Sequence, residues 1–209
     1  MSIAIIDYGS GNLRSAEKAF ARMAHAGDGR AVIVTSRPDD IAKAEHIVLP
    51  GVGAFGDCID GLVAIDGMIA ALREAVIEKA RPFLGICVGM QLMAEKGFER
   101  GTHDGLGWLA AEVHALDVQA GLKVPHMGWN NIAVAKPHRV LDGLNGADMY
   151  FVHGFAARAD AHLVAATVDY GGPRTAVVAR DNMIGTQFHP EKSQHKGLRL
   201  IGNFLEWRP

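Results

Sequence analysis

A cysteine flanked by glycines stands between an apolar run and a helical pattern in the segment Arg81-Pro-Phe-Leu-Gly-Ile-Cys-Val-Gly-Met-Gln91. This order is typical of a nucleophile elbow, in which a buried parallel strand ends, the nucleophile occupies a strained turn and a helix follows. Gly85 and Gly89 would let strand and helix pass closely. A helix beginning at Val88 would direct its first N–H groups at the Cys87 sulfur and favour the thiolate. The alternative is a small buried cysteine in a core strand.

A base for that thiol occurs far downstream, in the segment Gly185-Thr-Gln-Phe-His-Pro-Glu-Lys-Ser193. The base of a thiol nucleophile needs a third group that holds its tautomer and stabilises the imidazolium. His189 and Glu191 suit these roles, because they lie two residues apart at the end of an apolar strand pattern, where alternate side chains point the same way. Alternatively, His189 caps a strand and Glu191 is an ordinary first-turn acid of the last helix.

A glycine-rich loop follows a third apolar run, in Glu45-His-Ile-Val-Leu-Pro-Gly-Val-Gly-Ala-Phe-Gly56. Attack on a carbonyl creates an oxyanion, which preorganised backbone N–H groups stabilise. The stretch Gly51-Val52-Gly53 is predicted to form this oxyanion hole together with the N–H of Val88. A phosphate-binding loop is the competing interpretation. It is disfavoured because no nucleotide-binding glycine motif is completed and Asp57 would repel a phosphate.

Upstream of residue 100, apolar strand patterns alternate with helical patterns. Strands are predicted at 3–6, 31–35, 47–49 and 83–86, and helices at 13–24, at 59–80 with a division near Asp66-Gly67, and at 90–96. Such alternation predicts parallel strands with right-handed crossovers, whose carboxyl-end loops gather the site residues.

From residue 105 on, short strands dominate, with little helix between them. They are predicted at 109–116, 131–134, 150–153, 163–170 and 176–180, and a terminal helix at 196–207. Asp181-Asn182 is typical of a tight hairpin turn, here leading into the strand that carries His189. The predicted fold is α/β: a mostly parallel central sheet flanked by helices, with an antiparallel extension, in one domain over residues 1–209.

Composition favours an intracellular enzyme. A chain of 209 residues that is 49% hydrophobic can bury a substantial core. A net charge of −2 with dispersed basic residues gives no electrostatic reason to expect nucleic acid or a membrane surface. The two cysteines form neither a disulfide framework nor a metal motif, so a reducing, cytoplasmic location is expected. No apolar run is long enough to span a bilayer.

Three of these segments resemble the class I, triad-type glutamine amidotransferases: Gly-Ile-Cys-Val-Gly-Met-Gln at 85–91, His-Pro-Glu at 189–191 and Pro-Gly-Val-Gly-Ala-Phe-Gly at 50–56. Four others are similar to the glutaminase subunits of imidazole glycerol phosphate synthase, from histidine biosynthesis: Asp7-Tyr-Gly-Ser-Gly-Asn-Leu13, Pro125-His-Met-Gly-Trp-Asn130, Tyr150-Phe-Val-His153 and His189-Pro-Glu-Lys-Ser193. The resemblance spans nearly the whole chain. It implies a glutaminase that passes ammonia to a separate (β/α)₈-barrel cyclase subunit in a heterodimer. No cofactor and no metal are predicted.

The resemblance also implies roles for individual residues. Cys87 is then the nucleophile of a route through a γ-glutamyl thioester, His189 its base and Glu191 the orienting carboxylate. The oxyanion strand of the family matches Gly51, Val52 and Gly53, and its members are thought to need a peptide flip there before the hole forms. Glycines on both sides of Val52 make such a flip plausible.

Substrate contacts follow the family pattern with one departure. Gln91 matches a glutamine that contacts the substrate. The family commonly continues Tyr-Phe-Val-His with serine and tyrosine, whereas this chain has Gly154 and Phe155. Their hydroxyl contacts are therefore absent, and only backbone groups there are predicted to bind glutamine.

Three residues are assigned to the partner. Trp129 would be a core residue on aromatic content alone, but the resemblance implies a position near the cyclase interface, where tryptophan is a common anchor. Asn12 and Lys192 are either surface polar residues or help to relay cyclase occupancy to the oxyanion loop. His126 and His153 have no further ligand at metal spacing, so structural or interface roles are favoured for both.

Two rival functions remain open. One is an amidotransferase subunit of another synthase, such as the pyridoxal phosphate synthase, which the segments at 7–9 and 125–130 disfavour. The other is a noncatalytic, redox-sensitive or partner-binding protein on the same fold. The His-Pro-Glu segment opposes this second rival, because a redox sensor needs no carboxylate-oriented base.

Overall fold

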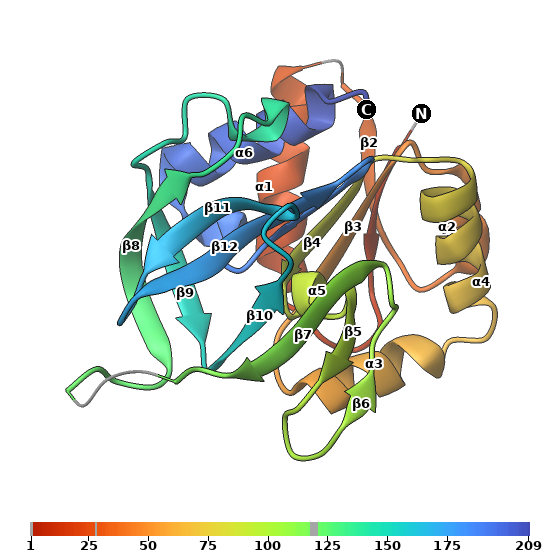
Figure 1. The fold of residues 1–209 in the computed structure, drawn as a ribbon. Helices are drawn as coiled ribbons and strands as arrows, with labels where there is room; N and C mark the ends of the chain where they lie inside the picture. Colours follow the sequence, from red (N-terminus) through yellow and green to blue (C-terminus); the bar gives the residue numbers. More distant parts are fainter. Residues whose placement is uncertain (1, 28, 118–120) are drawn as a thin grey trace.

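The structure, a computed structural model, describes residues 2–27, 29–117 and 121–209. A twisted nine-stranded sheet runs through the molecule, with helices packed against it and a smaller four-stranded sheet beside it (Figure 1). No helix in these described ranges is long and apolar enough to cross a membrane.

The parallel half of the large sheet has the order β2-β1-β3-β4-β13. Its strands are β1 (Ser2–Ile6), β2 (Ala31–Thr35), β3 (His46–Gly51), β4 (Phe83–Cys87) and β13 (Met183–Thr186). Every residue of β3, β4 and β13 is buried, as expected for strands covered on both faces. The four strands predicted upstream of residue 100 are confirmed.

The antiparallel half continues the sheet in the order β13-β12-β11-β8-β9. Its strands are β8 (His126–Val134), β9 (Asp148–His153), β11 (Val164–Asp169) and β12 (Pro173–Arg180). The predicted hairpin is confirmed, because Arg180 pairs with Met183 across a turn in which Asp181 has φ 50°. The antiparallel extension is also confirmed, and the sheet as a whole is mixed.

The smaller sheet was not predicted and has the order β10-β7-β5-β6. Its strands are β5 (Ala94–Gly97), β6 (His103–Asp104), β7 (Leu109–Ala115) and β10 (Phe155–Ala159). The helix predicted at 90–96 is wrong beyond Gln91, where α5 (Val88–Gln91) ends. The carbonyls of Leu92 and Met93, which a continuing helix would use internally, accept instead from the N–H groups of Leu106 and Trp108. Pairing with a distant segment therefore overrides the helical spacing.

Helices flank the two sheets: α1 (Leu13–Ala26), α2 (Pro38–Lys43), α3 (Phe55–Val63), α4 (Met68–Leu72) running into a π-helix (Arg73–Glu78), and α6 (Gln194–Glu206). The helices α1 and α6 lie side by side, and Phe20 meets Phe204 edge to face between them (Figure 1). The predicted division of residues 59–80 is confirmed at Gly67, which has φ 77°. The short helix α2 was not predicted.

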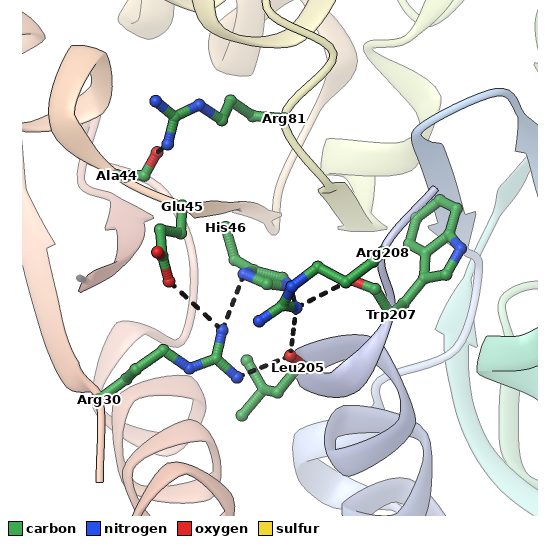
Figure 2. Close-up of polar contacts among 8 residues, drawn as sticks. All are labelled: Arg30, Ala44, Glu45, His46, Arg81, Leu205, Trp207 and Arg208. Atoms are coloured by element: carbon green, nitrogen blue, oxygen red, sulfur yellow. Dashed lines mark hydrogen bonds and ion pairs between the residues drawn. The ribbon is translucent and has the colours of Figure 1, made fainter. Parts of the chain in front are cut away.

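At the start of β3, two arginines enclose a buried histidine (Figure 2). The Nδ1 of His46 lies 3.0 Å from Arg30 Nη1, and its Nε2 lies 3.3 Å from Arg208 Nη1. Arg30 also donates to the carbonyl of Leu205, which ties this end of the sheet to α6. Burial, and then the charges of Arg30 and Arg208, lower the pKa of His46 to about 4. The ring is therefore neutral at neutral pH.

We expect this histidine to make folding sensitive to acid. Because its pKa is lower in the folded chain, its contribution is complete above pH 6.5, the ordinary value, and is lost as the pH falls toward 4. The loss is on the order of 3 kcal/mol. Urea unfolding at pH 7 and pH 4.5 should show a smaller acid-induced loss in His46→Gln than in the unaltered chain. His25→Gln, at an exposed position on α1, should behave like the unaltered chain. Equal losses in all three proteins would contradict this account.

Candidate active site

Cys87 is the last residue of β4, and α5 begins at the next residue. Its backbone angles are φ 54° and ψ −111°, a combination that residues with a side chain rarely adopt. A non-glycine residue in such a conformation stores strain that the surrounding structure must hold. The predicted elbow geometry is therefore present at Cys87.

Glycines make this turn possible. A Cβ at position 89 would lie 1.8 Å from the carbonyl oxygen of Leu49, and one at position 85 would lie 2.7 Å from the carbonyl oxygen of Gly89. Both obstacles are backbone atoms, which cannot rotate away. The helix α5 can therefore sit against β3 and β4 only because Gly85 and Gly89 have no side chains.

The parallel sheet brings three distant segments to the sulfur. Gly51, at the end of β3, pairs with Cys87 in register, and Thr186, at the end of β13, pairs with Ile86. The chain that leaves β13 therefore passes the elbow within three residues and carries His189 with it. This is the carboxyl end of the parallel strands, where α/β proteins commonly place their sites.

His189 and Glu191 form a buried ion pair or hydrogen bond, with 2.8 Å between Nδ1 and Oε1. Their side chains are 2% and 3% exposed. Because a carboxylate can only accept a hydrogen bond, Nδ1 carries the hydrogen of this bond, and Nε2 points away from Glu191. Within the described part of the chain, Nε2 has no hydrogen-bond partner of its own.

The prediction that the last strand extends as far as His189 is wrong. The strand β13 ends at Thr186, and Glu191 lies in a 3₁₀ turn, Pro190–Lys192. Pro190, which was expected to end the strand, lacks an N–H for a sheet ladder and instead begins this helical turn. The two side chains meet because the chain turns sharply, not because they alternate along a strand.

The surroundings of His189 favour the charged ring. Burial by itself would lower the pKa of His189, but the neighbouring Cys87 sulfur and the Glu191 carboxylate outweigh it and raise the pKa to about 10. An imidazole in this position takes up a proton readily beside the sulfur. That is the property required of the base in a Cys-His pair.

The Gly51-Val52-Gly53 stretch lies beside Cys87, but its central peptide groups are occupied. The N–H of Val52 donates to Ser10 Oγ at 3.2 Å, and Ser10 Oγ donates to the carbonyl of Val52. The thiol of Cys58 also donates to that carbonyl, at 3.4 Å. In this conformation the N–H of Val52 is bound to Ser10 and is not available to an oxyanion. Val88, the other predicted donor, is the first residue of α5, where N–H groups have no partner within the helix.

Two of the residues predicted to bind substrate meet behind the sulfur. Gln91 is 2% exposed, and its Nε2 donates to the carbonyl of Phe155 at 3.0 Å. Gly154 precedes Phe155 between β9 and β10, and its carbonyl accepts from the N–H of Leu116. Cys87 itself is only 3% exposed. Cys87 therefore exposes little of its surface to solvent in this conformation.

Sequence reasoning missed Gln187, Ser10 and Cys58. Gln187 is completely buried, and its Nε2 donates to Cys87 Sγ at 3.8 Å. Its position two residues before His189 could have indicated that its side chain lies near the site. Ser10 lies between two glycines of positive φ after β1, and Cys58 lies in α3; nothing local in either segment indicates contact with Val52.

The residues assigned to a partner lie on the surface. Trp129, on β8, is 49% exposed, which excludes a core position. The Nζ of Lys192 lies 5.8 Å from the ring centre of Tyr150, and Trp129 meets the same ring at 5.9 Å. Asn12 precedes α1 and is exposed, and its side chain makes no capping hydrogen bond.

His126 and His153 form a hydrogen-bonded pair with 3.1 Å between Nδ1 and Nε2. His153 is bound in turn to the carbonyl of Phe155 at 2.9 Å, and burial lowers its pKa to about 4. Among the residues that the structure describes, no three His, Cys, Asp or Glu side chains are grouped as metal ligands.

Comparison with known proteins gives a consistent picture. Residues 4–207 match the family described as "Glutamine amidotransferase class-I". The chain is 55% identical to a protein of Rhodopseudomonas palustris and 54% identical to one of Brucella suis, over 100% of both chains in each case. Both relatives are named "Imidazole glycerol phosphate synthase subunit HisH".

Solved structures of low sequence identity share the fold. One described as "Crystal structure of glutamine amidotransferase" superposes with a TM-score of 0.73 at 19% identity, covering 98% of this chain and 97% of its own. A glutamine amidotransferase from Thermotoga maritima has a TM-score of 0.65 at 14% identity, covering 99% of this chain and 96% of its own. The mixed α/β sheet flanked by helices is therefore a fold that glutamine amidotransferases use.

Proposed function

The chain belongs to the class I glutamine amidotransferase family, and from this premise we propose how its residues release ammonia from glutamine and for which partner. Its function is that of its full-length relatives: it is an enzyme, the glutamine amidotransferase subunit of imidazole glycerol phosphate synthase in histidine biosynthesis. The proposal takes residues 1–209 as one amidotransferase domain.

The reaction begins at the elbow. The Cys87 thiolate attacks the side-chain carboxamide carbon of glutamine, and a C–S bond forms. The His189 imidazolium then gives its proton to the departing nitrogen, ammonia leaves, and a γ-glutamyl thioester remains. His189 next takes a proton from water, which attacks the thioester and releases glutamate and the thiolate. The observation that carries this proposal is the His189–Glu191 pair at 2.8 Å beside a cysteine held at φ 54°.

The oxyanion of each tetrahedral intermediate needs donors on the side of Gly51. We assign them to the Val88 N–H and to an N–H of the Gly51-Val52-Gly53 stretch, after the Val52 peptide turns away from Ser10. Gly53 has φ 104°, a conformation that glycine adopts without strain, so this end of the peptide has the backbone freedom to turn. The resting conformation, with the Val52 N–H held by Ser10, then lacks one oxyanion donor.

Glutamine is bound by the groups behind the sulfur. Both N–H bonds of Gln91 are used within the protein, which leaves its Oε1 to accept from the α-ammonium group of the substrate. Backbone groups of Gly154 and Phe155 complete the contacts with the α-carbon end.

The partner that receives the ammonia is a separate (β/α)₈-barrel cyclase subunit. Ammonia released into neutral water becomes ammonium, which is no nucleophile, so uncoupled hydrolysis would waste glutamine. An exposed apolar group on and before β8 suits docking: Val124, Met127 and Trp129 are 52%, 63% and 49% exposed. Asn12 lies in the loop after β1, and Lys192 lies near Trp129. Both are assigned to the transmission of cyclase docking to the movement of the Val52 peptide.

Glutamate release by the purified chain should rise by about two to three orders of magnitude when the cyclase and its ribonucleotide substrate are added, because one oxyanion donor is gained. The measurement is glutamate formed from glutamine, with and without each addition. Trp129→Ala should need more cyclase to reach the same rate.

Other outcomes separate the rivals. A rate that is high alone and unchanged by cyclase would contradict the gating. Stimulation by the pyridoxal phosphate synthase partner instead would assign the chain to a different synthase, and no glutamate under any condition would leave only a noncatalytic role.

A further inference from the structure

Gln187 is a buried amide that contacts the reacting sulfur. Its side chain has no exposed surface, and its Nε2 lies 3.8 Å from Cys87 Sγ. A buried amide that lost this contact could not turn to water instead. Losing this contact would therefore leave the NH₂ group of Gln187 buried and without this hydrogen-bond acceptor.

The neighbouring hydrogen bonds fix which end of the amide faces the sulfur. The carbonyl of Phe155 can only accept, so the group facing it at 3.0 Å is the NH₂ of Gln91. The second hydrogen of that NH₂ meets Gln187 at 3.1 Å, which must be the Oε1 end. The NH₂ of Gln187 is then directed at Cys87, and the Phe155 carbonyl also contacts His153 Nδ1 at 2.9 Å.

We propose that Gln187 stabilises the Cys87 thiolate by donating an amide hydrogen to the sulfur, with Gln91 setting the orientation of that amide. This rests on the proposed function and adds a residue to the same site. Hydrogen bonds to an ionised group are stronger than those to a neutral one. Gln187 therefore stabilises the resting thiolate more than the neutral thioester.

The other groups near the sulfur leave this role open. His189, with Glu191 behind it, is the ionisable partner. Tyr8 donates its hydroxyl hydrogen to the Pro50 carbonyl, and the Cys58 thiol donates to Val52. Burial raises the pKa of both Tyr8 and Cys58, so neither brings a charge at neutral pH. Within residues 2–27, 29–117 and 121–209, Gln187 is thus the neutral side chain that donates a hydrogen bond to this sulfur.

The test is the rate at which iodoacetamide alkylates Cys87 in the isolated chain, followed across pH on the peptide that contains Cys87. Gln187→Glu keeps the acceptor for Gln91 but replaces the donor with a group that repels a thiolate. Gln187→Met has similar length and no donor. Both should be alkylated about tenfold more slowly at neutral pH, and the midpoint of the pH profile should move up by about one unit.

Thr186→Val is the matched control. Thr186 is as buried as Gln187 and precedes it in the chain. Its hydroxyl donates to the carbonyl of Phe188 and not to the sulfur, so the valine variant loses one buried hydrogen bond away from Cys87. It should lower stability while leaving the alkylation profile unchanged. A folded Gln187→Met with the profile of the unaltered chain would overturn the proposal, as would an equal shift in Thr186→Val. If Gln187→Glu does not fold, the Met variant decides.

Alkylation requires neither glutamine nor a partner. A shifted profile in a chain that never hydrolyses glutamine would therefore count against the proposed function and not against the role of Gln187. Conversely, normal partner-stimulated hydrolysis with unshifted profiles would overturn only the role of Gln187.

Discussion

Glutamate release in the complete mixture of this chain, cyclase and ribonucleotide should fall by at least about four orders of magnitude when Cys87 is replaced by alanine. No other described thiol can replace it, because Cys58 is buried in α3 and its pKa is raised by burial. His189 and Glu191 would remain in place but would have no nucleophile to activate. The measurement is the rate of glutamate formation, with binding of the cyclase checked separately.

Two further measurements on this position separate chemistry from folding. Cys87 raises the pKa of His189, so a nuclear magnetic resonance titration of Cys87→Ala should place that pKa below about 10. Cys87→Gly should be equally inactive but more stable than Cys87→Ala by about 1 kcal/mol, because glycine adopts φ 54° without strain. Retained activity in either variant would remove Cys87 from the mechanism, and a glycine variant less stable than the alanine one would contradict the strained elbow.

The largest effect on folding is expected from Gly89→Ala. The new Cβ would lie 1.8 Å from the Leu49 carbonyl oxygen and 2.8 Å from its carbon, so α5 or β3 must move as a unit. We expect the free energy of unfolding to fall by about 3 kcal/mol or more, with loss of activity because Cys87 moves with α5. Urea unfolding and glutamate release measure the two effects.

Gly27→Ala provides the matched comparison. A Cβ at position 27, just past α1, would meet its nearest neighbours at 3.5 Å and 3.7 Å, which is ordinary contact. Its stability should change by no more than about 0.5 kcal/mol. If Gly89→Ala were as stable and as active as Gly27→Ala, the close approach of α5 to β3 would not be the reason for glycine at position 89.

The local sequence pattern was sufficient to predict most elements of the parallel half of the large sheet. The strands at β1 to β4 are short apolar runs between turn residues, and the break at Gly67 follows from its backbone freedom. The helix predicted at 90–96 failed because Leu92 and Met93 give their carbonyls to residues 106 and 108. A long-range pairing of this kind leaves no mark on the spacing of nearby residues.

The predictions for the site divide in the same way, into residues found from the local sequence and contacts found only in the structure. Cys87, His189 and Glu191 were named from residue type and turn chemistry alone, and the structure brings their side chains to one place; their catalytic roles remain a proposal. The details behind them were not predicted. Gln187 contacts the sulfur, and Ser10 holds the Val52 peptide from a segment 42 residues away.

The sequence by itself determined which reactive groups are present: a cysteine between glycines at the end of an apolar run, a histidine with a carboxylate two residues later, and a glycine-rich loop after a strand. Those features depend on residue types that are close in the chain. Only the tertiary structure decided that Cys87 is buried, that the Val52 N–H is bound to Ser10 and that Gln187 faces the sulfur. These depend on parallel strands that align residues about 100 positions apart, and hydrogen-bond partners at such separations are set by packing and not by local preference.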